Sequence, residues 1–357
     1  MMQITSLTKL RLQKAKAAYT TRNVDFSVGT TLLRGNVIPQ SGNVVLAKVT
    51  EIGQHTRIEL ASGRRAHLFP GDEIIVCYGD RYAPDQFEAQ IPSDLATCHL
   101  VAAGGIAARA TAQHNRMDDP TTITPIGLIG DSEGKPINLR DYALSMTNFI
   151  NKTTPIFAVV GTSMNSGKTT TAAYLIRGLT EAGFKVGAAK ITGTGSGPDV
   201  GMMHDAGAAK VLDFSDLGFP STYRVAPRQI EAIFASLVNH LSSNNVDAIV
   251  LEIADGLYQA ETAHLIATPI FRQNIDGILF ATSDALGAAT GVKILQELDL
   301  PILAISGKVT ASPLATRETQ RATDFPVFSP ETIASEAAEF MTCVAQTQAQ
   351  PQLALPV

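Results

Sequence analysis

The pattern of hydrophobic residues differs between the two halves of the chain. Between residues 28 and 82, short alternating or β-branched runs are separated by turn sequences such as GQ, SG and PGD, which is typical of antiparallel strands. The pattern therefore predicts a small antiparallel sheet or barrel, with strands in GNVVLAKVTEI, HTRIEL, RRAHLF and DEIIVCYG.

The segment after these strands changes in composition. SDLATCHLVAAGGIAARATAQH is rich in small residues and is interpreted as a connection followed by a helix. MDDPTTITPIGLIGDSEGKPINLRDYAL is rich in Pro, Asp and Gly, which favours a linker between domains. The predicted organisation is an N-terminal lead at 1–27, a small β-rich domain at 28–115, a linker at 116–153, a second domain at 154–340 and a loose tail at 341–357.

From residue 155, apolar runs alternate with helical patterns. PIFAVVG, FKVGAAKITG, VDAIVLEIAD, DGILFATS and LPILAISGK are near-continuous apolar runs, as expected of parallel strands covered on both faces. TTTAAYLIRGLTEAG, RQIEAIFASLVNHLSSN and ALGAATGVKILQELD have helical periodicity. The second domain is therefore predicted to be α/β, with a doubly wound, mostly parallel sheet, preceded by the smaller β-rich domain.

Composition narrows the classes of function. A length of 357 residues fits two domains. With 45% hydrophobic residues and a net charge of -5, we expect a soluble globular protein with no attraction for nucleic acid or anionic membrane. No run reaches the roughly 18 apolar residues of a membrane span, so the expected location is cytoplasmic. The spacings of Cys77, Cys98, Cys343, His204 and His264 match neither a disulfide framework nor a zinc site.

One loop of the second domain carries a phosphate-binding pattern. GTSMNSGKTT lies between a predicted strand and a predicted helix, the context in which such a loop binds phosphate. Lys168 would reach the β and γ phosphates, and the Thr169 hydroxyl would bind magnesium. The alternative is a serine- and glycine-rich turn that caps a helix. The predicted nucleotide contacts are Gly161, Thr162, Asn165, Ser166, Gly167, Lys168, Thr169 and Thr170.

The loop departs from the strict pattern G-x-x-x-x-G-K-[ST], because Thr162 occupies the first glycine position and Gly161 lies one place earlier. With Gly161 as its start, the loop resembles that of dethiobiotin synthetase, whose family has G-T-x-x-x-x-G-K-T. KITGTGS, MMHDAGAAK and IVLEIADG resemble, in the same order, that family's lysine stretch, Asp-Ala pair at a helix start and acidic strand end. Cobyrinic acid amidating synthetases and the P-loop protein of molybdenum-cofactor assembly share much of this pattern.

The resemblance covers residues 155–330 and implies a ligase or kinase that uses ATP and Mg²⁺ on a small-molecule substrate. It implies catalytic roles for Lys168, Lys190 and Glu252, and magnesium ligation by Thr169, Asp205 and Glu252. The chain departs from the family at Ser163, at Asn165 and after Glu252, which leaves the acceptor open. The implied substrate candidates are Lys190, Thr194, Ser196 and Asp255.

Plainer interpretations exist for some of these residues. Lys190 could be a solvated lysine at a strand end, and Asp205 could be a helix N-cap. Glu252 follows the apolar run AIVL, where a carboxylate is costly to bury without a cation or a hydrogen-bond partner. Segments 283–287 and 306–310 follow late strands and could border the base or the acceptor. The chain has no N-K-x-D guanine signature, which favours ATP over GTP.

Three functions stay open. The first is a Mg-ATP-dependent enzyme that activates a small carboxylate or carbamate, and the second is a nucleotide-switched binding or delivery protein. The third is an acyltransferase-type enzyme that uses the loop for a cofactor phosphate such as that of coenzyme A. The β-rich domain could close over the phosphate loop, form a homodimer interface or bind a partner. Its turn region contains Asp72, Asp80, Arg81, Tyr82 and Asp85.

Overall fold

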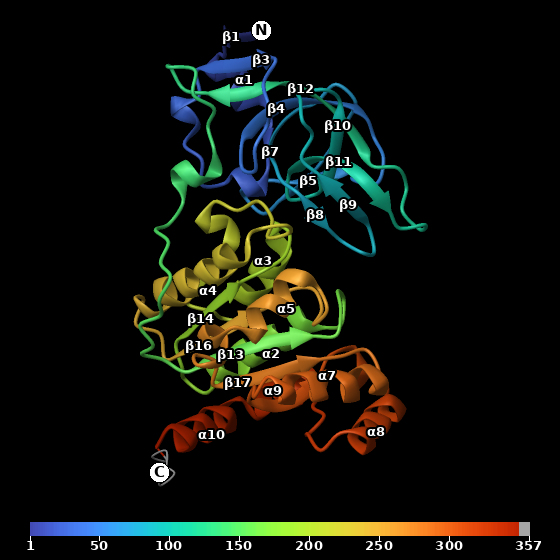
Figure 1. Ribbon diagram of the computed structural model, residues 1–357, viewed down its shortest axis with the longest axis vertical. Coiled ribbons are helices and arrows are strands. Elements are labelled where there is room, and N and C mark those ends of the chain that lie inside the picture. Colours follow the sequence, from blue (N-terminus) through green and yellow to red (C-terminus); the bar gives the residue numbers. More distant parts are fainter. Residues whose placement is uncertain (350–357) are drawn as a thin grey trace. The chain divides into compact units, whose positions relative to one another are not determined.

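The chain forms two compact units in the computed structural model, which describes residues 1–349 (Figure 1). Within that range, no helix is both long and apolar enough to cross a membrane. The end of the predicted loose tail, from residue 350, lies outside the described residues. Unit 1 comprises Met1–Met146, Thr192–Gly201 and Asp213–Ile233, and unit 2 comprises Thr147–Ile191, Met202–Leu212 and the described chain from Phe234 onward.

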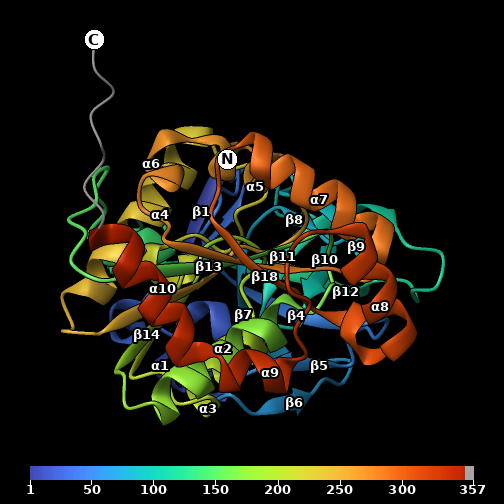
Figure 2. The same ribbon diagram turned by 90° about the horizontal axis from the view of Figure 1, so that it is seen from below.

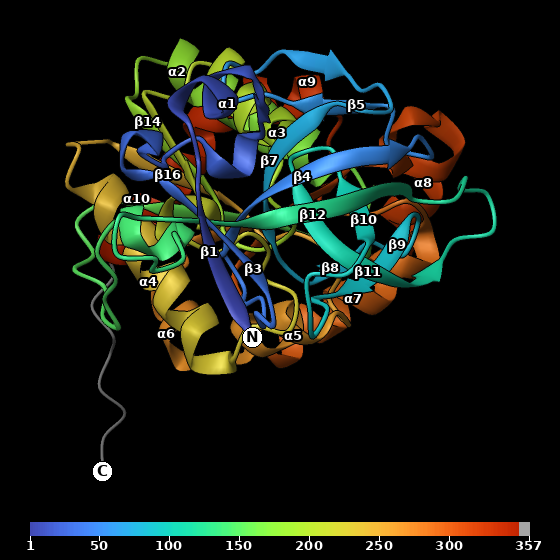
Figure 3. The same cartoon turned by 90° about the horizontal axis from the view of Figure 1, so that it is seen from above.

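Unit 1 is built on a ten-stranded sheet (Figure 3). Five strands close into a ring, because β12 pairs with β4, β4 with β7, β7 with β11, β11 with β10, and β10 with β12. Closure removes the free edges of these strands, so the sheet forms a barrel. The strands of the ten-stranded sheet are β1 (Met2–Ser6), β2 (Lys16–Ala17), β3 (Thr31–Gly35), β4 (Val44–Glu51), β7 (Glu73–Tyr78), β8 (Arg81–Tyr82), β9 (Phe87–Gln90), β10 (Cys98–Ala102), β11 (Ile106–Gln113) and β12 (Thr121–Gly130). β5 (Arg57–Glu59) and β6 (Arg65–His67) form a separate two-stranded sheet, and α1 (Lys9–Lys14) is the helix of this part of the chain.

Both faces of the barrel wall are buried. In β4, Val45 and Ala47 belong to one hydrophobic cluster, whereas Val44 and Leu46 belong to another. Successive residues of a strand face opposite sides, so the two clusters lie on the two faces of the wall. One cluster fills the barrel, and the other is covered by the N-terminal segment that includes Leu12. The predicted β-rich domain is therefore a closed barrel.

The structure corrects three predictions in this unit. The small-residue segment predicted to end in a helix forms the strands β10 and β11, because its alanines pair across strands and pack into the core, and this tertiary context overrides their helix propensity. The predicted linker contains β12, and its Pro125 lies at a register shift, where a proline is tolerated. The predicted lead contains β1, α1 and β2. Unit 1 is consequently larger than the domain predicted at 28–115.

Two segments from the second half of the sequence belong to unit 1. The carboxylate of Glu59 in β5 accepts hydrogen bonds from Ser196 Oγ at 3.0 Å and from Gly197 N at 2.9 Å. The hydroxyl of Tyr19 donates to Asp213 Oδ2 at 2.9 Å, and Arg22 forms an ion pair with Asp216 at 2.7 Å. These contacts fasten Thr192–Gly201 and Asp213–Ile233 to the N-terminal part of the chain.

Replacement of Glu59 tests how firmly Thr192–Gly201 is held. The Glu59 side chain is only 4% exposed. Glu59→Ala therefore removes a buried hydrogen-bond acceptor and leaves Ser196 Oγ and Gly197 N without this partner. We expect a loss of about 2–4 kcal/mol of unfolding free energy and faster protease cleavage within Thr192–Gly201. Urea unfolding followed by circular dichroism and mapped limited proteolysis measure the two effects. Glu51→Ala, at an exposed position of β4, is the matched control, and equal behaviour of the two variants would contradict the prediction.

Unit 2 contains a six-stranded sheet with the strand order β15-β14-β16-β13-β17-β18. β13 pairs in parallel with β16 and β17, β14 with β16, and β17 with β18. These pairs bring the carboxyl ends of β13, β14, β16, β17 and β18 to one edge, where α/β sheets bind ligands. The strands are β13 (Ile156–Gly161), β14 (Val186–Lys190), β15 (Lys210–Asp213), β16 (Ala248–Glu252), β17 (Gly277–Ala281) and β18 (Ile302–Ser306).

Helices cover both faces of this sheet. Figure 2 shows α2, α9 and α10 on one side and α5, α6 and α7 on the other. The predicted doubly wound α/β fold is confirmed, because the five predicted strands and three predicted helices of this half are all present. The helices are α2 (Lys168–Glu181), α3 (Gly197–Asp205), α4 (Pro227–Ser242), α5 (Ala260–Ala267), α6 (Pro269–Arg272), α7 (Ala285–Glu297), α8 (Pro313–Ala322), α9 (Pro330–Ser335) and α10 (Ala337–Ala349), of which α10 occupies the start of the predicted tail.

Candidate functional site

The predicted phosphate loop connects β13 to α2. Two of its residues have left-handed backbone conformations, Asn165 with φ of 61° and Gly167 with φ of 104°. Gly167 precedes the first residue of α2, so the loop leads directly into a helix N-terminus. The first N–H groups of a helix have no intrahelical partner and favour an anion there. The strand, loop and helix therefore have the arrangement that a phosphate requires.

Steric contacts explain the displaced glycine. A Cβ at Gly161 would overlap Ser166 Oγ and would lie only 2.9 Å from the carbonyl oxygen of Ala281. Thr162 is half-buried at the next position, and its backbone N–H donates to the same carbonyl oxygen at 3.0 Å. This loop therefore needs its first glycine at the end of β13 and accepts threonine at the next position.

Lys168 is held inside the loop. Its Nζ donates to the carbonyl oxygen of Ser163 at 2.8 Å, and the residue is only 5% exposed. The ammonium group thus crosses from the start of α2 to the opposite side of the loop. A phosphate in the loop would accept hydrogen bonds from this charged donor, and charge-assisted hydrogen bonds are the strong ones.

The structure brings Thr169 and Glu252 together. Thr169 Oγ1 donates to Glu252 Oε1 at 2.9 Å, although the two residues are 83 positions apart. Glu252 ends β16 and is only 2% exposed. A hydroxyl and a carboxylate oxygen are ligands that Mg²⁺ accepts, together with phosphate oxygens and waters. The pair fits the predicted magnesium site, and within residues 1–349 no group of three or more His, Cys, Asp or Glu offers an all-protein site.

Lys190 lies beside this pair. It is the last residue of β14, it is 8% exposed, and its Cα is paired with that of Glu252 in the parallel ladder. Asp255 follows three residues after Glu252 in a left-handed conformation with φ of 65°. At the next position, a Cβ on Gly256 would overlap the carbonyl oxygen of Thr162. The turn after β16 therefore packs directly against the phosphate loop.

The magnesium role predicted for Asp205 does not agree with its position. Asp205 is an exposed residue that ends α3 instead of opening a helix. Four residues later, Ala209 N donates to Val186 O at the amino end of β14, and the intervening Gly207 lies against Thr180. Thr180 follows Thr169 by 11 residues, or about 16 Å along α2. Asp205 thus lies toward the amino edge of the sheet, away from the loop.

Two other substrate candidates belong to unit 1. Thr194 forms an isolated bridge with Ser221, and the hydroxyl of Ser196 is bound by Glu59. Both belong to Thr192–Gly201, which is part of unit 1, although the chain enters this segment two residues after Lys190. Their predicted contact with substrate stays a prediction.

Gly307 packs closely on the phosphate loop, a contact that was not predicted from the sequence. A Cβ at Gly307 would overlap the carbonyl oxygen of Ser166, and the next residue, Lys308, donates its N–H to the same oxygen at 2.9 Å. The sequence feature that marks this position is Ser-Gly-Lys after an apolar strand. The sequence alone predicted only that segment 306–310 could border the base or the acceptor. Asp284, in the other such segment, caps α7 by accepting from Gly287 N at 2.8 Å.

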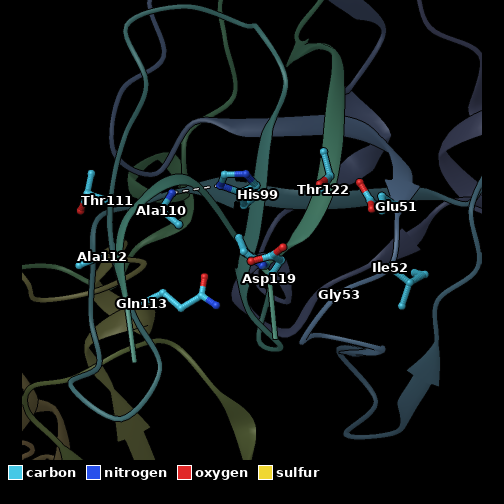
Figure 4. A pocket seen from close by; sticks show the side chains of 11 residues that line it. Glu51, Ile52, Gly53, His99, Ala110, Thr111, Ala112, Gln113, Asp119 and Thr122 are labelled. Carbon is cyan, nitrogen blue, oxygen red and sulfur yellow. Dashed lines mark hydrogen bonds between the residues drawn. The ribbon is translucent and has the colours of Figure 1, made fainter. Parts of the chain in front are cut away.

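Unit 1 contains a separate cavity of ≈ 440 Å³ between β4, β10, β11 and β12 (Figure 4). His99 Nδ1 accepts a hydrogen bond from Ala110 N at 3.1 Å, and burial together with the charge of Arg109 lowers the pKa of His99. The neutral imidazole therefore carries its proton on Nε2. Glu51 and Asp119 line the same cavity. The cavity could not be predicted from the sequence, because three of its four strands lie in segments predicted as helix, connection or linker.

Neither a family model nor a curated protein matches the chain. Among solved structures it is similar to chloroplast FtsY from Physcomitrella patens, with 15% identity, coverage of 58% of this chain and 70% of that chain, and a TM-score of 0.37. It is similar to the signal recognition particle 54 kDa protein from Aeropyrum pernix K1 in complex with GDP, with 18% identity, coverage of 56% and 48%, and a TM-score of 0.37. A third is the septum site-determining protein MinD complexed with Mg-ADP from Pyrococcus horikoshii OT3, with 18% identity, coverage of 57% and 100%, and a TM-score of 0.35.

The parallel sheet and the loop between β13 and α2 define the class of unit 2, which has the nucleotide-binding P-loop NTPase fold. The specific function depends on this chain's own residues.

Proposed function

We propose that the chain is a magnesium-dependent nucleoside triphosphatase whose nucleotide state controls what unit 1 binds. The observation that carries the proposal is the 2.9 Å contact between Thr169 Oγ1 and Glu252 Oε1 at the start of the helix that follows the phosphate loop. A loop hydroxyl beside a buried carboxylate is the oxygen pair that a nucleotide-bound Mg²⁺ uses. ATP is the proposed nucleotide, because the chain lacks a guanine signature.

Each residue of the site has a definite task in this reaction. Mg²⁺, when bound, would neutralise charge that develops on the β and γ phosphates. The loop backbone and Lys168 would hold the phosphates, while Thr169 and Glu252 would supply oxygens to the metal. Glu252 could also orient a water molecule, because its carboxylate lies at the carboxyl edge of the sheet beside Lys190. Such catalysis acts through positioning and electrostatics, without a covalent intermediate on the protein.

The path of the chain supports a switch. β14 ends at Lys190, and the chain enters the unit 1 segment Thr192–Gly201 two residues later. That segment is anchored within unit 1, because Gly193 N donates to Thr222 Oγ1 at 2.8 Å and Thr222 N donates to Gly193 O at 2.9 Å. A nucleotide-dependent shift at the end of β14 would pass through one covalent connection into unit 1, and ordering or release of a loop beside the γ-phosphate is a known form of switching.

Glu252→Gln tests the role of the contact between Thr169 and Glu252. The amide keeps the shape of the side chain but removes the charge that would attract the metal, so we expect magnesium-dependent phosphate release to fall about a hundredfold. Steady-state phosphate release from ATP and from GTP, with and without chelation of the metal, measures this. Glu297→Gln, on an exposed side chain of α7, is the control. Wild-type rates in Glu252→Gln, or rates that are indifferent to chelation, would rule out the proposal.

Lys190 favours a second candidate, a Mg-ATP-dependent enzyme that activates a small carboxylate or carbamate. A lysine that is 8% exposed and adjacent to Glu252 could neutralise a phosphoryl group during its transfer to an acceptor. The two candidates differ in what accelerates hydrolysis. The enzyme is favoured if a small carboxylic or amino acid stimulates phosphate release and is itself modified once for each phosphate released. The switch is favoured if only a binding partner of unit 1 stimulates phosphate release.

A further inference from the structure

A second cavity of unit 1, of ≈ 320 Å³, is built on a row of residues that crosses three strands. Tyr82 of β8 is paired with Glu88 of β9, and Glu88 is paired with Ala112 of β11. Residues directly opposite one another project from the same face of a sheet. The small side chain of Ala112 therefore leaves space beside the Glu88 carboxylate and the Tyr82 ring. The residues that line the cavity are Tyr82, Ala83, Pro84, Gln86, Glu88, Ala112, Gln113, His114 and Tyr223.

Aromatic rings form the walls of this cavity. Tyr223 comes from the unit 1 segment Asp213–Ile233, and its ring centroid lies 5.5 Å from that of Tyr82 at an angle of 41°. The hydroxyl of Tyr223 donates to Glu88 Oε1 at 2.8 Å, which fixes the ring beside the carboxylate. His114 supplies a third ring, and its Nδ1 accepts a hydrogen bond from Arg116 N at 3.2 Å.

The charge of the lining is negative. Among the described residues that line the cavity, Glu88 is the one carboxylate, and there is no lysine or arginine. The neighbouring guanidinium groups have partners of their own. Arg81 is buried, and its Nη2 donates at 2.8 Å to Oε1 of Gln86, which lines the cavity, so this guanidinium lies close to the lining without being part of it. Arg224 Nη1 lies 3.9 Å from Asp80 Oδ2.

We propose that this cavity binds a small molecule that carries an ammonium group, with a quaternary group preferred. The faces of aromatic rings attract cations. An alkylated ammonium group is weakly hydrated, so it loses little when it leaves water for a cavity formed by aromatic rings and a carboxylate. The volume fits a small ligand. Ala112 and Gln113 also line the cavity of Figure 4, so the remainder of a longer ligand has an adjoining polar space. This inference goes beyond the proposed function, since it needs no nucleotide.

Choline and its neutral isostere 3,3-dimethylbutan-1-ol provide the test on the full chain without nucleotide. Calorimetric titration at constant ionic strength is expected to show choline binding about tenfold more tightly than the neutral isostere, and ethanolamine binding between the two. Glu88→Gln and Tyr82→Ala should each weaken choline about fivefold or more. Ala112→Leu should abolish binding, because its larger side chain fills the space beside Glu88. Tyr223→Phe keeps the ring and should retain binding.

Glu51→Gln, in the adjoining cavity, is the matched control and should leave the choline affinity unchanged. Equal affinity for choline and the alcohol, no heat with choline at tens of millimolar, or full binding by folded Ala112→Leu would each overturn the site. If Tyr82→Ala does not fold, Glu88→Gln decides, because it changes charge at constant shape. Failure here leaves magnesium-dependent phosphate release intact, whereas failure of the proposed function leaves choline binding intact.

Discussion

Lys168→Ala is expected to lower ATP affinity and phosphate release by about 10²- to 10³-fold, the range seen when one pre-positioned donor to a developing charge is removed. The reason lies in how the side chain is held. Lys168 Nζ is fixed on Ser163 O at 2.8 Å inside a loop that leaves the residue 5% exposed, so the charge is already positioned before a phosphate arrives. Truncation to alanine removes both the charge and the pre-organisation. Calorimetric titration with Mg-ATP and steady-state phosphate release measure the two losses.

Two further variants separate charge from geometry. Lys168→Arg keeps a cation, but the forked guanidinium needs more room than the lysine side chain. The loop is tightly packed around Lys168, since even a Cβ added to Gly161 would lie only 2.9 Å from Lys168 Cγ. We therefore expect arginine to restore little of the lost activity. Lys293→Ala removes an exposed lysine from α7 and should behave as wild type. Unchanged ATP affinity in a folded Lys168→Ala would mean that the loop caps α2 and holds no phosphate, which was the alternative that the sequence left open.

The nucleotide site could be predicted because its signals are local. A buried strand, a glycine-containing loop and a helix follow one another in the sequence. A carboxylate that follows the apolar run AIVL is costly to bury unless it faces a cation or a hydrogen-bond donor. Thr169 and Glu252 were accordingly predicted to lie together, and the 2.9 Å contact agrees. Asp205 was assigned only by resemblance to a motif, and no local signal fixed which edge of the sheet it would face. Asp205 is the last residue of α3, which ends toward the amino edge of the sheet.

The barrel could be predicted only in part, because its remaining strands depend on distant partners. β11 is rich in alanine and reads as helix, but its Ile106 and Ala107 pair in parallel with β7, nearly 30 residues earlier. The attachment of Thr192–Gly201 to unit 1 depends on Glu59, which no periodicity connects to Ser196. Such contacts follow from the whole fold, so a pattern read over a window of neighbouring residues cannot reveal them.

Acid is expected to destabilise unit 1 through His55, well above the pH at which carboxylates titrate. Burial and the nearby charge of Arg81 lower the pKa of His55 to about 3 from an ordinary value of 6.5. Its imidazole therefore stays neutral in the folded chain while the unfolded chain takes up a proton below pH 6.5. Since the unfolded state then binds more protons, stability falls as the pH falls through this window, by about 2 kcal/mol between pH 7 and pH 5 and about 3 kcal/mol by pH 4.

His55→Gln isolates this effect, because an amide can still donate a hydrogen bond but does not titrate. The variant should lose some stability at pH 7, since the contact of the His55 ring with Phe87, at 5.9 Å between centroids, is removed. Between pH 7 and pH 5 it should then lose about 2 kcal/mol less than wild type. Hydrogen exchange of β4 and β7, with β13 of unit 2 as internal reference, measures the difference. Carboxylates with lowered pKa, such as Glu73 beside Arg11, act in the same direction only below about pH 4.5. Parallel pH profiles for wild type and His55→Gln above pH 5 would show that the buried imidazole is not the group that titrates.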